Sequence, residues 1–208
     1  MYISKIQYIT PHYQADNYFK ELLNVIDAGV DWIQIRVKDL PYQQWLDVAN
    51  GAVALCKQNN VVCIINDSPA IALQSSAHGV HLGKNDMSPI EARNILGATA
   101  IIGGTANNFD DIKSLVRQGI DYIGLGPFRF TTTKKNLSPI LGLDGYRIIM
   151  EQCKANNITT PIIAIGGITG DDITGIVETG ITGFAFSGYI ATAVDKKLLI
   201  ASLKKVLA

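Results

Sequence analysis

The chain has 208 residues, of which 48% are hydrophobic and 17% are charged, and its formal net charge is zero. This length predicts a single domain over residues 1–208 with a large core. A net charge of zero excludes a general electrostatic attraction to nucleic acids or to anionic membranes, and no apolar run reaches membrane-spanning length.

The three cysteines, Cys56, Cys63 and Cys153, are odd in number and lack metal-ligand spacing. Cys63 lies in an apolar segment and is expected in the core. This cysteine usage favours a reducing compartment over a disulfide scaffold, and the first residues lack the pattern of a signal peptide. We therefore expect a soluble, cytoplasmic protein.

One pattern recurs along the chain: an amphipathic helix, a glycine at its carboxyl end, a short apolar strand and a polar strand end. Its four copies contain Gly29, Gly79, Gly119 and Gly180. Glycine is favoured there because the residue after a helix often adopts a left-handed conformation. Four more strands are predicted near residues 3–9, 61–66, 99–104 and 161–166.

Helix starts are marked as well. Residues 88–91 predict a capping box with proline at the first helical position, and Ser68 with Pro69 predicts a similar start. Strands that alternate with helices predict a parallel sheet. Eight such units in 208 residues favour an α/β fold of the (β/α)8 TIM-barrel type over the alternative, a doubly wound open sheet.

In such barrels the functional groups lie where strands run into the following loops. At the end of the second strand, alternation places Gln34, Arg36 and Lys38 on one face, the interior of a barrel. Two inward cations are costly unless they bind an anion. A diphosphate would explain both cations, and the alternative is an ordinary exposed strand end.

The third and fourth strands each end in a carboxylate, Asp67 and Asp86. Two carboxylates facing one gap near a phosphate are a usual way to hold Mg2+, although each could also be an acidic residue at a helix start. We expect His81 to be a structural hydrogen-bonding residue, because no serine or cysteine nucleophile lies near it.

The remaining strand ends favour binding of phosphate groups. Thr105 follows two glycines after the fifth strand, which is weak evidence by itself. After the sixth strand, Gly126 and Pro127 stop an apolar run, and residues 131–135 then present three threonines and two lysines. Hydroxyls and ammonium groups suit phosphate oxygens, and a polar surface loop is the alternative.

Gly167 after the seventh strand, and Ser187 and Gly188 after the eighth, suit a phosphate site made of backbone amides. Tight turns without a ligand are the alternative. Together the strand ends predict a cationic anion site, a second anion site of hydroxyls and backbone, and a divalent metal. That combination describes an enzyme that joins a diphosphate ester to a monophosphate, with diphosphate leaving.

In their order and spacing these segments resemble the thiamine-phosphate synthase (thiamine-phosphate pyrophosphorylase) family. The matching segments are residues 34–38, 65–67, 81–87, 126–134 and 164–168. The resemblance implies a TIM-barrel transferase of thiamine biosynthesis. It would join 4-amino-2-methyl-5-hydroxymethylpyrimidine diphosphate to a thiazole phosphate, giving thiamine phosphate and diphosphate.

The resemblance also implies the roles of individual residues. The pyrimidine diphosphate would be bound by Gln34, Arg36, Lys38, Asn66, Thr105 and Lys134. The thiazole phosphate would be bound by Thr131, Thr133, Gly167, Ser187 and Gly188. Asp67 and Asp86 would hold Mg2+, and with it the catalytic residues Arg36, Lys38 and Lys134 would stabilise charge on the leaving diphosphate. The implied mechanism is dissociative and needs no general base, because the thiazole nitrogen carries no proton.

The chain departs from the family pattern without losing a required charge. Val37 stands where a glutamate is common, Thr105 replaces a serine, Phe130 and Thr132 replace prolines, and Ser187 replaces an apolar residue.

The sequence leaves two alternatives to the synthase. A sister branch isomerises the thiazole phosphate with a histidine near the fifth strand, and residues 105–108 contain none. A non-catalytic phosphate-binding barrel would not need Asp67, Asp86 and Lys134. The sequence leaves open whether copies of the chain form a homo-oligomer.

Overall fold

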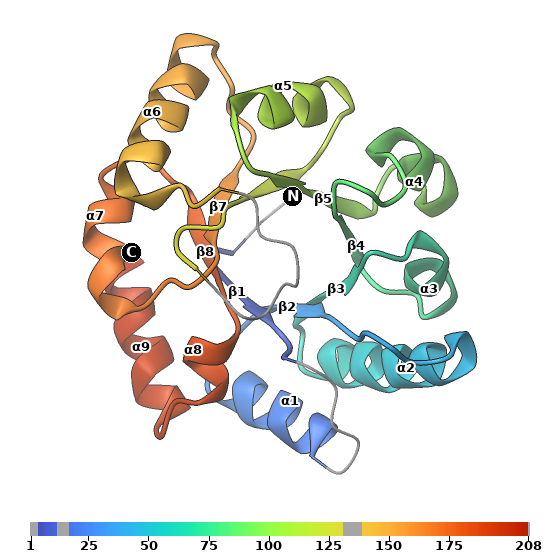
Figure 1. Ribbon diagram of the computed structural model, residues 1–208. Coiled ribbons are helices and arrows are strands. Elements are labelled where there is room, and N and C mark those ends of the chain that lie inside the picture. The colour runs from blue at the N-terminus through green and yellow to red at the C-terminus, as the bar shows by residue number, and fades with distance from the viewer. Residues whose placement is uncertain (1–3, 12–16, 131–138, 208) are drawn as a thin grey trace.

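The computed structural model describes residues 4–11, 17–130 and 139–207. Within these residues, eight parallel strands pair in chain order, and the eighth returns to pair with the first. Figure 1 shows the helices as a ring around the strands. The predicted TIM barrel is confirmed, and the open sheet is excluded.

The strands are short, and helical segments separate them. The strands are β1 (Ile6–Ile9), β2 (Trp32–Ile35), β3 (Val62–Asn66), β4 (Gly79–Leu82), β5 (Ile101–Ala106), β6 (Tyr122–Leu125), β7 (Ile162–Ile165) and β8 (Gly183–Phe186). The helices are α1 (Tyr18–Asp27), α2 (Tyr42–Gln58), α3 (Pro69–Gln74), α4 (Pro89–Leu96), α5 (Phe109–Arg117), α6 (Gly142–Ala155), η1 (Gly170–Asp172), α7 (Ile173–Val177), α8 (Gly188–Ala191) and α9 (Lys196–Leu207).

The predicted helix starts are confirmed by their caps. Ser88 Oγ accepts from the amide of Glu91 at 3.3 Å, and the Glu91 carboxylate accepts from the amide of Ser88 at 3.1 Å. Ser68 Oγ accepts from the amide of Ile71 at 3.3 Å. Each cap satisfies an amide that the first helical turn leaves without a backbone partner.

The glycine pattern holds at three of its four positions. Gly29, Gly119 and Gly180 have φ angles of 98°, 71° and 91°. Gly79 is different, because α3 ends earlier and Ser76 takes the left-handed conformation with φ 55°. Gly79 lies inside β4, where a Cβ atom would collide with the carbonyl oxygen of Ile101 on β5. The prediction for Gly79 was therefore wrong, and close approach of two strands explains this glycine.

Two layers of apolar side chains lie on the two faces of the sheet. Ile33, Ile35 and Val37 belong to the large core between the strands and the helices, whereas Trp32 belongs to the smaller core inside the barrel. This alternation places Gln34 inside the barrel, as predicted. All three cysteines are free and buried. No helix of the described residues is long and apolar enough to span a membrane.

Candidate active site

The end of β2 meets the end of β3 through an amide pair. Gln34 is 3% exposed, and its Nε2 donates a hydrogen bond of 2.6 Å to Asn66 Oδ1. The other end of the Gln34 amide, Oε1, is buried and has no hydrogen-bond partner among the described residues. An unpaired buried acceptor is costly. This atom therefore suits a ligand that brings a donor.

The neighbouring strand ends bring Lys38 to the two carboxylates. Lys38 Nζ forms an ion pair with Asp67, and Asp86 Oδ2 accepts from the amide of Gly83 at 2.6 Å. Partial burial raises the pKa of Asp86, and the adjacent Asp67 carboxylate raises it further. The structure thus brings Asp67 and Asp86 together, as the sequence predicted.

This pair of carboxylates fits a magnesium ion. No group of three or more His, Cys, Asp or Glu side chains with metal-binding geometry occurs within residues 4–11, 17–130 and 139–207. Magnesium keeps several waters and takes only one or two carboxylates besides phosphate oxygens. Two hard oxygen donors beside a cationic strand end meet that requirement.

Arg36 follows β2 and is half-buried. Its backbone amide donates to Thr10 Oγ1 at 2.8 Å, and the Tyr18 hydroxyl donates to the same oxygen at 3.2 Å. Thr10 follows β1 and is 3% exposed. The sequence reasoning missed Thr10, whose only signal was a hydroxyl just after the first strand.

His81 lies inside the barrel and is hydrogen-bonded through both ring nitrogens. Its Nε2 is 3.0 Å from Thr105 Oγ1, and its Nδ1 is 3.0 Å from the hydroxyl of Tyr122. Gln7 Nε2 donates to that same hydroxyl at 3.2 Å. The expectation that His81 is a hydrogen-bonding residue agrees with these contacts, whereas Gln7 and Tyr122 were missed.

The loop after β6 is tied to the loop after β7. Arg129 donates to both carboxylate oxygens of Asp172, at 3.0 and 2.7 Å, and to the carbonyl of Gly167 at 3.2 Å. Gly167 has φ 72°, and a Cβ there would lie 3.1 Å from the carbonyl oxygen of Phe130. Only glycine fits this position without strain. The sequence reasoning did not single out Arg129.

Ser187 and Gly188 lie where β8 runs into α8. A Cβ atom on Gly188 would meet no described atom within 4 Å, so its backbone borders open space. Together with Gly167 they remain the predicted backbone part of the second anion site. Thr131, Thr133 and Lys134 lie outside the described residues, so the predictions for them stay predictions.

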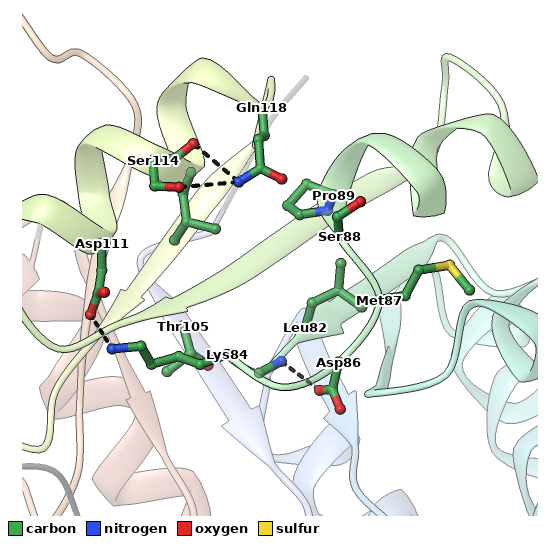
Figure 2. Close-up of a pocket in the computed structure, with 12 residues that line it drawn as sticks. Leu82, Lys84, Asp86, Met87, Ser88, Pro89, Thr105, Asp111, Ser114 and Gln118 are labelled. Carbon is green, nitrogen blue, oxygen red and sulfur yellow. Dashed lines mark hydrogen bonds and ion pairs between the residues drawn. The ribbon is translucent and has the colours of Figure 1, made fainter.

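A pocket of about 280 Å³ lies at the ends of β4 and β5, on the side that faces the helices (Figure 2). It is bounded by Leu82, Asp86, Met87 and Thr105 and by side chains of α5, and the ion pair of Lys84 with Asp111 borders it at 2.7 Å. Leu82 belongs to the core between strands and helices, which places the pocket outside the barrel. Its lining shares Asp86 and Thr105 with the predicted site but none of the residues of β2 or β3.

Comparisons with known proteins identify the family and support the fold. A family model described as thiamine monophosphate synthase matches residues 6–190. A thiamine-phosphate synthase of Bacteroides thetaiotaomicron is 47% identical over 190 residues, which are 91% of each chain. One of Phocaeicola vulgatus is 48% identical over 203 residues, covering 98% of this chain and 96% of the relative. The solved thiamine phosphate pyrophosphorylase of Pyrococcus furiosus superposes with a TM-score of 0.83 at 26% identity, covering 98% of this chain and 95% of that one.

Proposed function

The chain belongs to the thiamine monophosphate synthase family, and we propose that it joins a pyrimidine methyl diphosphate to a thiazole phosphate in a Mg2+-dependent reaction. The products are thiamine phosphate and diphosphate. The matching family model and the relatives above are all described as synthases or pyrophosphorylases, and nothing in them favours the tautomerase or the non-catalytic barrel.

One observation carries the proposal: three adjacent strands bring complementary groups to one end of the barrel. β2 leads to Arg36 and Lys38, β3 leads to Asn66 and Asp67, and the loop after β4 carries Asp86. Cations beside paired carboxylates suit a diphosphate that shares a divalent ion with the protein.

The pyrimidine is held by the amide pair in this scheme. Gln34 Oε1 needs a donor, and the exocyclic amino group of the aminopyrimidine supplies one. Gln34 itself is fixed by Asn66, so its acceptor is oriented before the substrate arrives. A fixed acceptor saves the entropy of ordering the side chain on binding.

The reaction breaks the bond between the pyrimidine methylene carbon and the bridging diphosphate oxygen. Both electrons leave with the diphosphate, and the thiazole nitrogen then donates its lone pair to the methylene carbon. The nitrogen carries no proton, so no side chain needs to act as a base. Arg36, Lys38 and Lys134 stabilise the negative charge that develops on the leaving group.

Asp67 and Asp86 are the residues that would hold Mg2+. The ion would neutralise charge on the diphosphate oxygens as the bond breaks. Lys38 pairs with Asp67 in the free chain. With the diphosphate bound, the Lys38 ammonium group would contact a phosphate oxygen instead of the carboxylate. The phosphate of the acceptor is bound by Thr131, Thr133, Gly167, Ser187 and Gly188.

The test is to incubate the purified chain with both substrates and Mg2+ and to quantify thiamine phosphate and diphosphate. The proposal predicts equal amounts of the two products and none when either substrate is omitted. Thiazole phosphate isomerised without coupling would indicate the sister branch, and recovery of both substrates unchanged would favour the non-catalytic barrel.

A further inference from the structure

A line of hydrogen bonds crosses the barrel interior and ends at the predicted substrate site. It runs from Gln7 on β1 through Tyr122 on β6 and His81 on β4 to Thr105 on β5, with separations of 3.2, 3.0 and 3.0 Å. Gln7, Tyr122 and His81 are 1%, 0% and 7% exposed, whereas Thr105 is only half-buried. The line therefore begins in the core and reaches the surface only at Thr105.

The chemistry of each group indicates which partner donates and which accepts in each hydrogen bond of the line. The Gln7 amide nitrogen can only donate, so the Tyr122 oxygen accepts from it. Burial raises the pKa of the Tyr122 phenol well above its ordinary value, so the phenol keeps its proton at neutral pH. Of the two described groups that contact this hydroxyl, Gln7 Nε2 can only donate, so His81 Nδ1 is the one that can accept the phenol proton. A neutral His81 then carries its proton on Nε2 and donates it to Thr105 Oγ1.

Two glycines make room for these rings inside the barrel. A Cβ atom at Gly103 would overlap the ring of Tyr122, and one at Gly124 would lie 3.1 Å from His81 Cε1. Tyr122 is also held edge-on against Trp32, with ring centroids 4.8 Å apart. The rings are thus fixed by packing as well as by hydrogen bonds, which holds the groups of the line at these separations.

We propose that His81 is a positioning residue for the synthase reaction: Gln7, Tyr122 and His81 fix the Thr105 hydroxyl as a hydrogen-bond donor to an oxygen of the departing diphosphate. In this arrangement Thr105 Oγ1 accepts the hydrogen bond from His81 Nε2, so the proton of its own hydroxyl is available to a further acceptor. A donor fixed in advance stabilises charge that appears on that oxygen in the transition state. This inference rests on the proposed function.

The first test reads the tautomer of His81 in the free protein by 15N NMR with labelled histidine. The chain has three histidines, and the His81 signals are assigned by their loss in His81→Gln. The inference predicts an unprotonated Nδ1 and a protonated Nε2 at neutral pH. It also predicts that Tyr122→Phe, which keeps the ring but removes the donor, shifts His81 toward the other tautomer.

The matched control is Tyr146→Phe, which removes the hydroxyl of another buried tyrosine that bonds to the carbonyl of Leu125. It should leave the His81 signals in place. A wild-type His81 protonated on Nδ1, or a Tyr122→Phe spectrum no different from that of Tyr146→Phe, would overturn the inference. The NMR measurement does not depend on catalytic turnover. It therefore tests the direction of the hydrogen bonds at His81 even if the chain fails the synthase assay.

The second test measures kinetics in a double-mutant cycle. Thr105→Val should lower kcat roughly tenfold, the loss expected for one hydrogen bond to a charged group, and Thr105→Ser should restore most of it. Tyr122→Phe should lower kcat in the same direction, and the double variant should be no slower than Thr105→Val alone. Losses that multiply in the double variant would mean that Tyr122 acts independently of Thr105, which would overturn the inference.

Discussion

At the scale of single residues, Lys38 is the group whose partner changes between the structure and the proposed diphosphate complex. In the free chain it pairs with Asp67, which also keeps that carboxylate compatible with the nearby Asp86. In the proposed complex it would face the diphosphate. An exposed ion pair of this kind contributes only about 0–1 kcal/mol, so its opening costs little when a stronger anion arrives.

Lys134 gives the clearest single-residue prediction about catalysis. Lys134→Ala should lower kcat by roughly tenfold or more, since the proposed mechanism assigns this cation to stabilising the leaving diphosphate. Binding of thiazole phosphate should change much less. The measurement is steady-state kinetics beside equilibrium titration of thiazole phosphate. Lys135→Ala removes the same charge one position away and serves as the matched control; wild-type turnover in Lys134→Ala would refute the assigned role.

The side chains that face the barrel interior at the strand ends were predictable from the sequence, because alternation in a strand decides which side chains share a face. That argument placed Gln34 inside the barrel correctly. It could not find Gln7 or Tyr122, because each is one polar or aromatic residue in an apolar strand. Their partners lie on other strands, and the hydrogen bond between these two joins residues 115 positions apart.

At the scale of strands and helices, the interior glycines decide which rings fit the barrel. Gly103→Ala forces a methyl group into the ring of Tyr122, and overpacking of this kind costs about 1–3 kcal/mol. We expect a lower midpoint in urea unfolding. Gly188→Ala is the stability control, because its methyl group would meet no described atom within 4 Å. Equal midpoints for Gly103→Ala and the wild type would contradict this account of the packing.

The ion pair of Arg129 with Asp172 gives a prediction about pH. Burial alone would raise the pKa of Asp172, but hydrogen bonds from Thr169 and Arg129 outweigh it and lower the pKa. A carboxyl whose pKa is lower in the folded state stabilises the fold above its unfolded pKa, near 3.9, and loses that effect as pH falls through the folded value.

Asp172→Asn should therefore lower the free energy of unfolding by about 1 kcal/mol at neutral pH. The difference from the wild type should shrink as the pH falls below about 4. Urea unfolding across this range measures it. Asp144→Asn, which breaks the exposed ion pair with Arg147, should change stability little at any pH. A difference for Asp172→Asn that stays constant down to pH 2 would count against the depressed pKa.

Element boundaries were partly predictable, and the misses have physical causes. The capping serines were found because a cap is a local pattern of side chain and nearby amide. Gly79 was misassigned, because a glycine required by an adjacent strand looks the same in sequence as one required by a helix end. The tie between Arg129 and Asp172 was missed, since it joins two loops 43 residues apart.

At the scale of the whole molecule, closure of the barrel turns separate strand ends into one site. The carboxyl ends of parallel strands lie at the same end of the barrel. Residues near positions 36, 67, 86, 105, 167 and 187 therefore face a common region. The sequence predicted this arrangement because eight alternating units allow few topologies. It did not predict the polar line inside the barrel, which depends on how the strands are staggered in the closed sheet.

The central claim is that the ends of β2, β3 and β4 form one site for a diphosphate with its magnesium ion. The direct measurement is calorimetric titration of inorganic diphosphate with and without Mg2+, in the wild type and in Asp67→Asn. The wild type should bind diphosphate at least tenfold more tightly with Mg2+, about 1.4 kcal/mol. Asp67→Asn should lose most of that gain while binding metal-free diphosphate no more weakly, because Lys38 is released. Equal wild-type affinities with and without Mg2+, or a full magnesium effect in Asp67→Asn, would contradict the account.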